Sequence, residues 1–209
     1  MSVLERLASA LGRRDDVPNQ ELAREVAAAR DEEAVRELVV HLNDRDRNIQ
    51  SDCIKVLYEI GYLAPELIAD YADEFLALLR SRNNRLVWGG MIALSTIAAL
   101  KAPFLYAHRE EIMRAIEQGS VITQDRGIKA LALVAAQRAE YREALFPYLL
   151  KHLATSRPKD VPQRAEAILS AVTAENREPF LQVLTDRMAD LKPSQVRRVK
   201  KVIAATERR

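Results

Sequence analysis

The stretch EFLALLRSRNNRLVWGGMIALSTIA, residues 74–98, decides how this chain folds. Its first apolar run ends near Arg80, a short polar turn follows, and a second apolar run begins at Arg85. We expect two helices joined by this turn, and we call them A and B here and in similar units. Glycines number only six, and no run of alternating β-branched residues stands out, so the whole chain is predicted to be all-α.

Similar units recur on both sides of this stretch. Each has one mark in its A helix and another 15 or 16 residues later in its B helix: Leu42 and Leu57, Leu79 and Leu94, Ile116 and Leu131, Leu153 and Leu169, Met188 and Ile203. Successive A marks are 37, 37, 37 and 35 residues apart. A fixed period in this range is the signature of a solenoid, in which stacked helix pairs complete one another's core.

The B helices share a second feature, a small or modest residue four positions before the mark: Cys53, Gly90, Gly127, Ala165 and Val199. Together with apolar residues one before and three after the mark, these positions lie on one helix face. Small side chains there let A and B helices approach closely. Gly89 has no such packing reason in the sequence, and it is interpreted as room for a ligand beside Trp88.

Two segments resemble HEAT repeats of the HEAT/armadillo-like class. They are LFPYLLKHLATSRPKDVPQRAEAILSAV, residues 145–172, and LVVHLNDRDRNIQSDCIKVLYEIG, residues 38–61. The resemblance implies a right-handed α-solenoid of about five HEAT-like helix pairs over residues 31–209, capped by helices within 1–30, as one domain of 1–209. The family often pairs a turn Asp with an Arg early in helix B, and here that ladder is patchy.

The N-terminal cap is expected to hold a short helix over residues 3–11, closed by Gly12, and a second from Gln20 to about Arg30. Asn19 is predicted to cap the second helix at its start. Ten to twelve helices are expected in all.

Net charge is +2 and unevenly placed. Residues 1–104 carry 13 basic and 17 acidic side chains, which gives −4, and residues 105–209 carry 19 and 13, which gives +6. The single cysteine, Cys53, excludes an internal disulfide and a Cys-based zinc site. The N-terminus has no signal-peptide pattern, and the longest uncharged apolar stretch, 86–100, is too short to span a bilayer. A cytoplasmic protein is expected.

In HEAT-like proteins the B helices typically line a concave, ligand-holding side. Positions five and two before each mark face outward, and in the C-terminal half they form a basic stripe of Arg126, Lys129, Arg164, Arg198 and Lys201. Such a stripe suits acidic peptides or phosphates. The alternative is that these cations pair with carboxylates such as Asp125, Asp160 and Glu166 and only hold the repeats in register. Trp88 is either a binding anchor or a packing residue.

The function expected is a non-catalytic scaffold that holds a protein or acidic peptide in its groove, with no metal, no cofactor and no catalytic residue. Phosphate-binding glycine loops, nucleophile elbows and HExxH motifs are missing from the sequence. The second hypothesis is nucleic-acid binding, as in proteins resembling the HEAT-built alkylpurine DNA glycosylases, with Asp125 as the acidic residue. A third is simple self-association.

Overall fold

The A/B pairs predicted from the period are present in a computed structural model that describes residues 2–208. Within that range the chain forms twelve α-helices and no strand. The five pairs are α2 (Glu32–Val40) with α3 (Arg47–Leu63), α4 (Ala72–Leu78) with α5 (Asn84–Ile97), α7 (Arg109–Gln118) with α8 (Val121–Ala135), α9 (Ala139–Ala154) with α10 (Val161–Ile168), and α11 (Arg177–Arg187) with α12 (Pro193–Glu207).

Two α-helices lie outside these pairs, α1 (Val17–Ala29) and α6 (Ala102–Ala107), and the first short helix is a 3-10 turn, η1 (Val3–Arg6). Asn19 does not cap α1, because the helix already begins at Val17. Asn19 is buried instead, and its side chain accepts from the amide of Ala8 (2.9 Å) and donates to Asp52 (2.8 Å). Asn19, which was predicted to be a helix cap, therefore links the N-terminal segment to α3.

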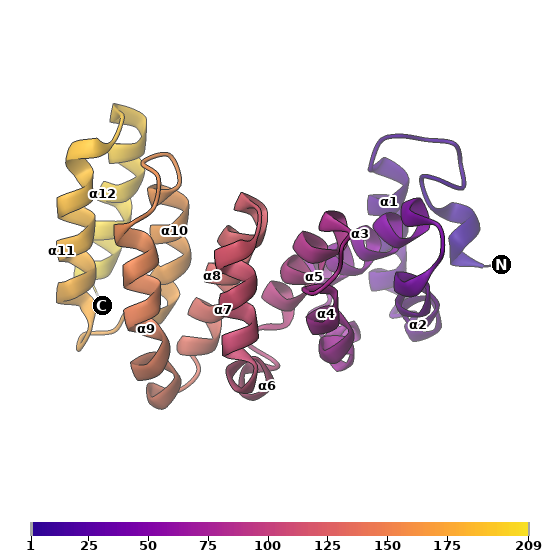
Figure 1. The fold of residues 1–209 in the computed structure, drawn as a ribbon, viewed down its shortest axis with the longest axis horizontal. Coiled ribbons are helices and arrows are strands. Elements are labelled where there is room, and N and C mark those ends of the chain that lie inside the picture. Colours follow the sequence, from indigo (N-terminus) through magenta and orange to yellow (C-terminus); the bar gives the residue numbers. More distant parts are fainter. Residues whose placement is uncertain (1, 209) are drawn as a thin grey trace.

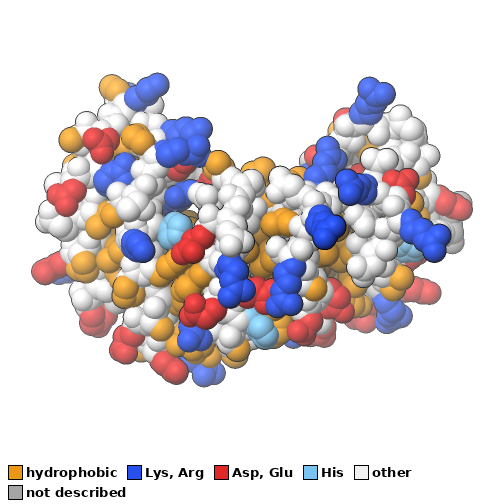
Figure 2. Space-filling model, viewed as in Figure 1, with side chains coloured by type: hydrophobic (Ala, Val, Ile, Leu, Met, Phe, Trp, Pro, Cys, Tyr) orange, Lys and Arg blue, Asp and Glu red, His pale blue; other side chains and the backbone are white. Residues whose placement is uncertain are grey.

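The helices form two layers. The B helices contact one another in the order α3, α5, α8, α10 and α12, with α1 packed on α3 before them, and the A helices form the second layer. Figure 1 shows the pairs succeeding one another in an arc from the N-terminus to the C-terminus. In Figure 2, seen from the same side, the upper edge of the arc is hollowed between its two ends. The right-handed sense of the superhelix stays a prediction.

Most of the marks lie in the core as the period predicts, but three marks in the last two pairs, Leu169, Met188 and Ile203, are only partly buried. Leu57, Leu94 and Leu131 are fully buried. The turn before α10 carries one extra residue, and Arg164, which was predicted to face outward, is buried beside the predicted core residues Ala165 and Ile168. The buried face of α10 is therefore wider than the sequence predicted.

Two glycines let neighbouring helices touch. A Cβ on Gly90 would lie 2.9 Å from the carbonyl oxygen of Phe75, so this residue allows α4 and α5 to pack closely, as predicted. A Cβ on Gly89 would lie 2.7 Å from Cγ1 of Ile54 in α3. The interpretation of Gly89 as room for a ligand is therefore wrong, because it is the contact point between two B helices.

None of the helices in residues 2–208 combines the length and the apolar character needed to cross a lipid bilayer. Over the same residues, no cluster of three or more His, Cys, Asp or Glu side chains is arranged to hold a metal ion.

Candidate functional site

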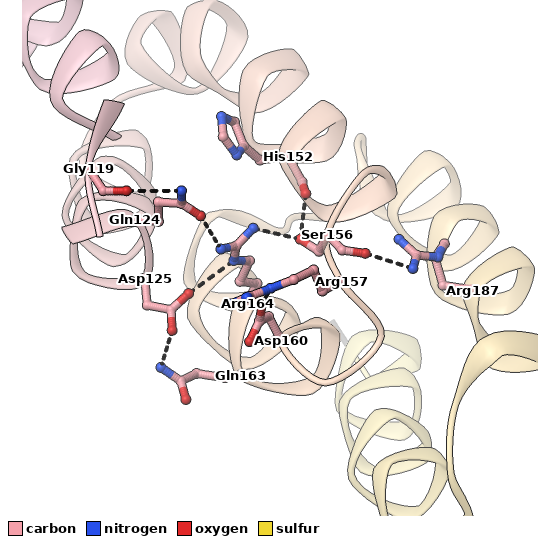
Figure 3. A network of polar contacts seen from close by, with 10 residues as sticks. All are labelled: Gly119, Gln124, Asp125, His152, Ser156, Arg157, Asp160, Gln163, Arg164 and Arg187. Atoms are coloured by element: carbon pink, nitrogen blue, oxygen red, sulfur yellow. Dashed lines mark hydrogen bonds and ion pairs between the residues drawn. The ribbon is translucent and has the colours of Figure 1, made fainter. Parts of the chain in front are cut away.

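The candidate site is the exposed side of the B-helix layer, which we call the B face. Arg164 is the most buried member of the predicted basic stripe, with 5% of its side chain exposed. Its Nε donates to Asp125 (3.0 Å), Nη1 to Ser156 (2.9 Å) and Nη2 to Gln124 (2.8 Å). Figure 3 shows these side chains converging from α8 and α10 and the turn after α9. Arg164 joins two repeats and does not face outward.

The outward face of α10 therefore differs from the prediction. Arg164 was expected on it, but this residue is buried beside Ala165, which belongs to the predicted core face. The exposed residues of α10 are Gln163 and Glu166. Neither was singled out as an outward residue by the sequence.

Further contacts around Arg164 tie three repeats together (Figure 3). Gln163 donates to the second carboxylate oxygen of Asp125 (3.0 Å), so that carboxylate is bound by two residues of α10. From α11, Arg187 donates to the carbonyl oxygens of Ala154 (2.6 Å) and Ser156 (2.7 Å) at the end of α9. Cations at a helix C-terminus satisfy its free carbonyl groups. These residues hold the C-terminal repeats in register.

Arg198 is also paired with a carboxylate, as the pairing alternative expects, but its ion pair lies at the surface. Its guanidinium makes a bidentate ion pair with Glu166, at 2.9 and 2.6 Å, and both side chains are nearly half exposed. The hydrogen bond to Glu166 raises the pKa of Arg198. Between α3 and α5 the corresponding link is an amide pair, in which Asn83 donates to Gln50 at 3.1 Å.

Three stripe residues, Arg126, Lys129 and Lys201, form no ion pair within residues 2–208. Arg126 and Lys129 lie one turn apart on α8 and line a recess of about 430 Å³ between α8, α10 and α12. The two acids that line the recess, Asp125 and Glu166, are already bound by Arg164 and Arg198. Burial and the charge of Arg126 together lower the pKa of Lys129. Lys201 is exposed and lies outside the recess lining.

Next to the recess lies an aromatic cluster of Tyr58, Tyr62 and Trp88. The Tyr58 ring centre is 6.1 Å from that of Trp88 and 6.3 Å from that of Tyr62. Trp88 is partly buried and packs on the core, which agrees with the packing alternative, whereas Tyr62 is 43% exposed. The guanidinium carbon of Arg126 lies 5.9 Å from the centre of the Tyr62 ring. The two tyrosines were not predicted as site residues, although their four-residue spacing on one B helix is visible in the sequence.

Contact between Arg126 of α8 and Tyr62 of α3 has a geometric consequence. The helix α5 lies between these two elements in the B layer. Packed helices are about 8–10 Å apart, so side chains two helices away from each other meet most readily where the surface curves inward. The contact therefore supports a concave B face at α5.

No family model and no curated protein matches the sequence. Among solved structures, a designed armadillo repeat protein in complex with the peptide (KR)4 has a TM-score of 0.68 and 16% identity, over 90% of this chain and 86% of that one. An engineered protein matches with a TM-score of 0.65 and 18% identity, over 100% and 98% of the two chains.

A natural protein matches as well. The karyopherin Kap121p, in its complex with the SUMO protease Ulp1p, has a TM-score of 0.65 and 12% identity, over 95% of this chain and 22% of that chain. Identities this low show the fold alone. The chain thus has a HEAT/armadillo-like α-solenoid fold, as the repeat period and the two quoted segments predicted.

Proposed function

We propose that this protein is a non-catalytic scaffold that binds an extended, acidic segment of a partner protein along its B face. The observation that carries the proposal is the recess with Arg126 and Lys129, whose charges are not offset by the acids beside them. Two partly buried cations close together repel each other, and an anionic side chain placed between them relieves that repulsion. An acidic segment supplies such side chains.

Solved structures with the same fold support binding of a polypeptide on it. The designed armadillo repeat protein holds a basic peptide, and Kap121p is bound to a protein. For the present chain the charges in the recess favour the opposite sign of peptide. We keep the cytoplasm as the expected compartment and residues 1–209 as one binding domain.

The nucleic-acid hypothesis has less support from the site. Asp125, the acid that a glycosylase-like site requires, is bound by Arg164 and Gln163, and only 11% of its side chain is exposed. General acid–base chemistry needs a carboxylate within reach of a substrate. Binding of a duplex without chemistry is therefore kept as an outcome of the test.

The test uses a synthetic (Asp-Glu)4 peptide, followed by calorimetry and by fluorescence of Trp88, which is the only tryptophan in the chain. We expect binding that weakens as salt increases, with no binding of a (Lys-Arg)4 peptide. The double variant Arg126→Glu/Lys129→Glu should bind at least about tenfold more weakly, since two lost contacts of about 1 kcal/mol each exceed the 1.4 kcal/mol of a tenfold change.

The matched control is Arg114→Glu/Lys151→Glu, which makes the same charge change on exposed residues of the A helices α7 and α9. It should bind the acidic peptide nearly as well as the unaltered protein. Equal weakening in both double variants would mean that net charge alone attracts the peptide. Tight binding of a duplex without binding of the acidic peptide would favour the nucleic-acid hypothesis.

A further inference from the structure

The B face changes character on either side of Arg126. Toward the C-terminus lies the basic recess, shared by α8, α10 and α12. Toward the N-terminus, the end of α3 exposes two large apolar side chains, Tyr62 (43%) and Leu63 (55%). A surface that is basic on one side and apolar on the other suits a partner segment that is acidic and apolar at matching places.

Arg126 belongs to both parts. It lines the recess, and its guanidinium carbon is 5.9 Å from the Tyr62 ring centre. At the corresponding positions of α5, between them, the chain has Gly89, which has no side chain, and Ile92, which is 5% exposed. No side chain of α5 at these positions separates the recess from Tyr62.

We propose that the partner segment carries an acidic residue with a large apolar residue two positions away. The acid would bind Arg126 and Lys129, and the apolar side chain would cover Tyr62. This inference rests on the proposed function and specifies the motif that the B face selects.

The spacing follows from the measured distance. A carboxylate oxygen bound to a guanidinium lies about 3 Å from its nitrogen atoms. Added to the 5.9 Å from Arg126 to the centre of the Tyr62 ring, this places the acid at most about 9 Å from that ring. An extended chain advances about 3.3 Å per residue and alternates its side chains between two faces, so an acid and an apolar residue two positions apart, about 6.6 Å, lie on the same face within this distance.

The surroundings of Tyr62 favour a protein segment over a nucleic acid. One side of its ring is near Arg126, and the edge contact with Tyr58 occupies another part. Its exposed chain neighbour Leu63 is aliphatic, whereas single-stranded bases bind through stacking on aromatic rings. An apolar amino-acid side chain gains from aliphatic and aromatic neighbours alike.

Three synthetic peptides of equal length and charge test the motif. The first has a Glu-Glu pair in a Gly/Ser background, the second adds a Phe two positions from the pair, and the third places that Phe at the far end of a long Gly/Ser spacer. We expect the second peptide to bind about five- to tenfold more tightly than the first, equivalent to about 1–1.4 kcal/mol from partial burial of a Phe side chain. The third should match the first.

Variants assign the gain to Tyr62. Tyr62→Ser should abolish the advantage of the second peptide, and Leu63→Ser should reduce it, while both variants still bind the first. The control Leu11→Ser, an equally exposed apolar residue near the N-terminus, should change nothing. Far-UV circular dichroism checks that each variant is folded.

Two outcomes overturn the inference alone. One is equal affinity for the first and second peptides, and the other is an advantage for the second peptide that persists in Tyr62→Ser. In either case binding of the first peptide that depends on Arg126 leaves the proposed function intact. Failure of all three peptides to bind would overturn both.

Discussion

Replacing Arg164 with Met should destabilise the protein strongly, because it leaves a buried carboxylate without its cation. The arginine side chain is 5% exposed and that of Asp125 is 11% exposed, so little water can replace the lost contact. Removing one partner of a buried ion pair costs about 3–5 kcal/mol. Asp125 keeps its hydrogen bond from Gln163, so we expect the lower end, about 3 kcal/mol.

Urea unfolding of the whole chain, followed by circular dichroism, measures this cost. With a urea dependence of about 2–3 kcal/mol per molar, a loss of 3 kcal/mol lowers the midpoint by about 1–1.5 M. The matched control is Arg198→Met, which breaks the half-exposed pair with Glu166 and should cost at most about 1 kcal/mol. Adding Asp125→Asn to Arg164→Met should recover part of the loss. Equal urea midpoints for Arg164→Met and Arg198→Met would refute the conclusion that Arg164 stabilises the contact between repeats.

Three further predictions concern packing and protonation. Gly89→Ala should destabilise the protein by about 1–3 kcal/mol in the same urea experiment, because the added Cβ meets Ile54, and a stabilised variant would disprove that contact. Burial and the nearby charge of Arg164 lower the pKa of His152. As the pH falls, the unfolded chain therefore binds a proton at this imidazole before the folded protein does. Stability should therefore fall as the pH drops below about 6.5, and His152→Gln should show a smaller fall, whereas identical pH profiles would contradict this account. Burial raises the pKa of Cys53 to about 12, so its thiol should not react with a disulfide reagent at pH 8 until the protein unfolds, and rapid labelling of the folded chain would contradict its buried position.

The repeat period predicted the core well, because core positions depend only on spacing within helices. Leu57, Leu94 and Leu131 are fully buried, and the small residue Gly90 lies against α4 as expected. The prediction was less accurate in α10, where Ala165 and Ile168 are buried as expected but Leu169 is only partly buried and Arg164 is buried instead of facing outward. The burial of Arg164 depends on its partners Asp125 and Ser156, which the helical period alone does not predict.

Predicting the site from the sequence was harder, since it depends on which charges find partners. Arg126, Arg164 and Arg198 occupy equivalent counted positions, yet one contacts an aromatic ring, one is buried in an ion pair, and one is paired at the surface. Pairing across repeats joins residues about 30 to 40 positions apart, as in Asp125 with Arg164. The contact of Arg126 with Tyr62 spans two repeats and follows from the curvature of the B layer.

Chemical labelling of Lys129 tests most directly whether an acidic segment binds in the recess. The rate of acylation by an amine-reactive ester is measured by mass spectrometry, with and without saturating (Asp-Glu)4 peptide. Lys151, exposed on the A helix α9, is the internal reference. We predict that the peptide slows labelling of Lys129 severalfold and leaves Lys151 unchanged. Bound peptide with an unaltered labelling rate at Lys129 would contradict the account.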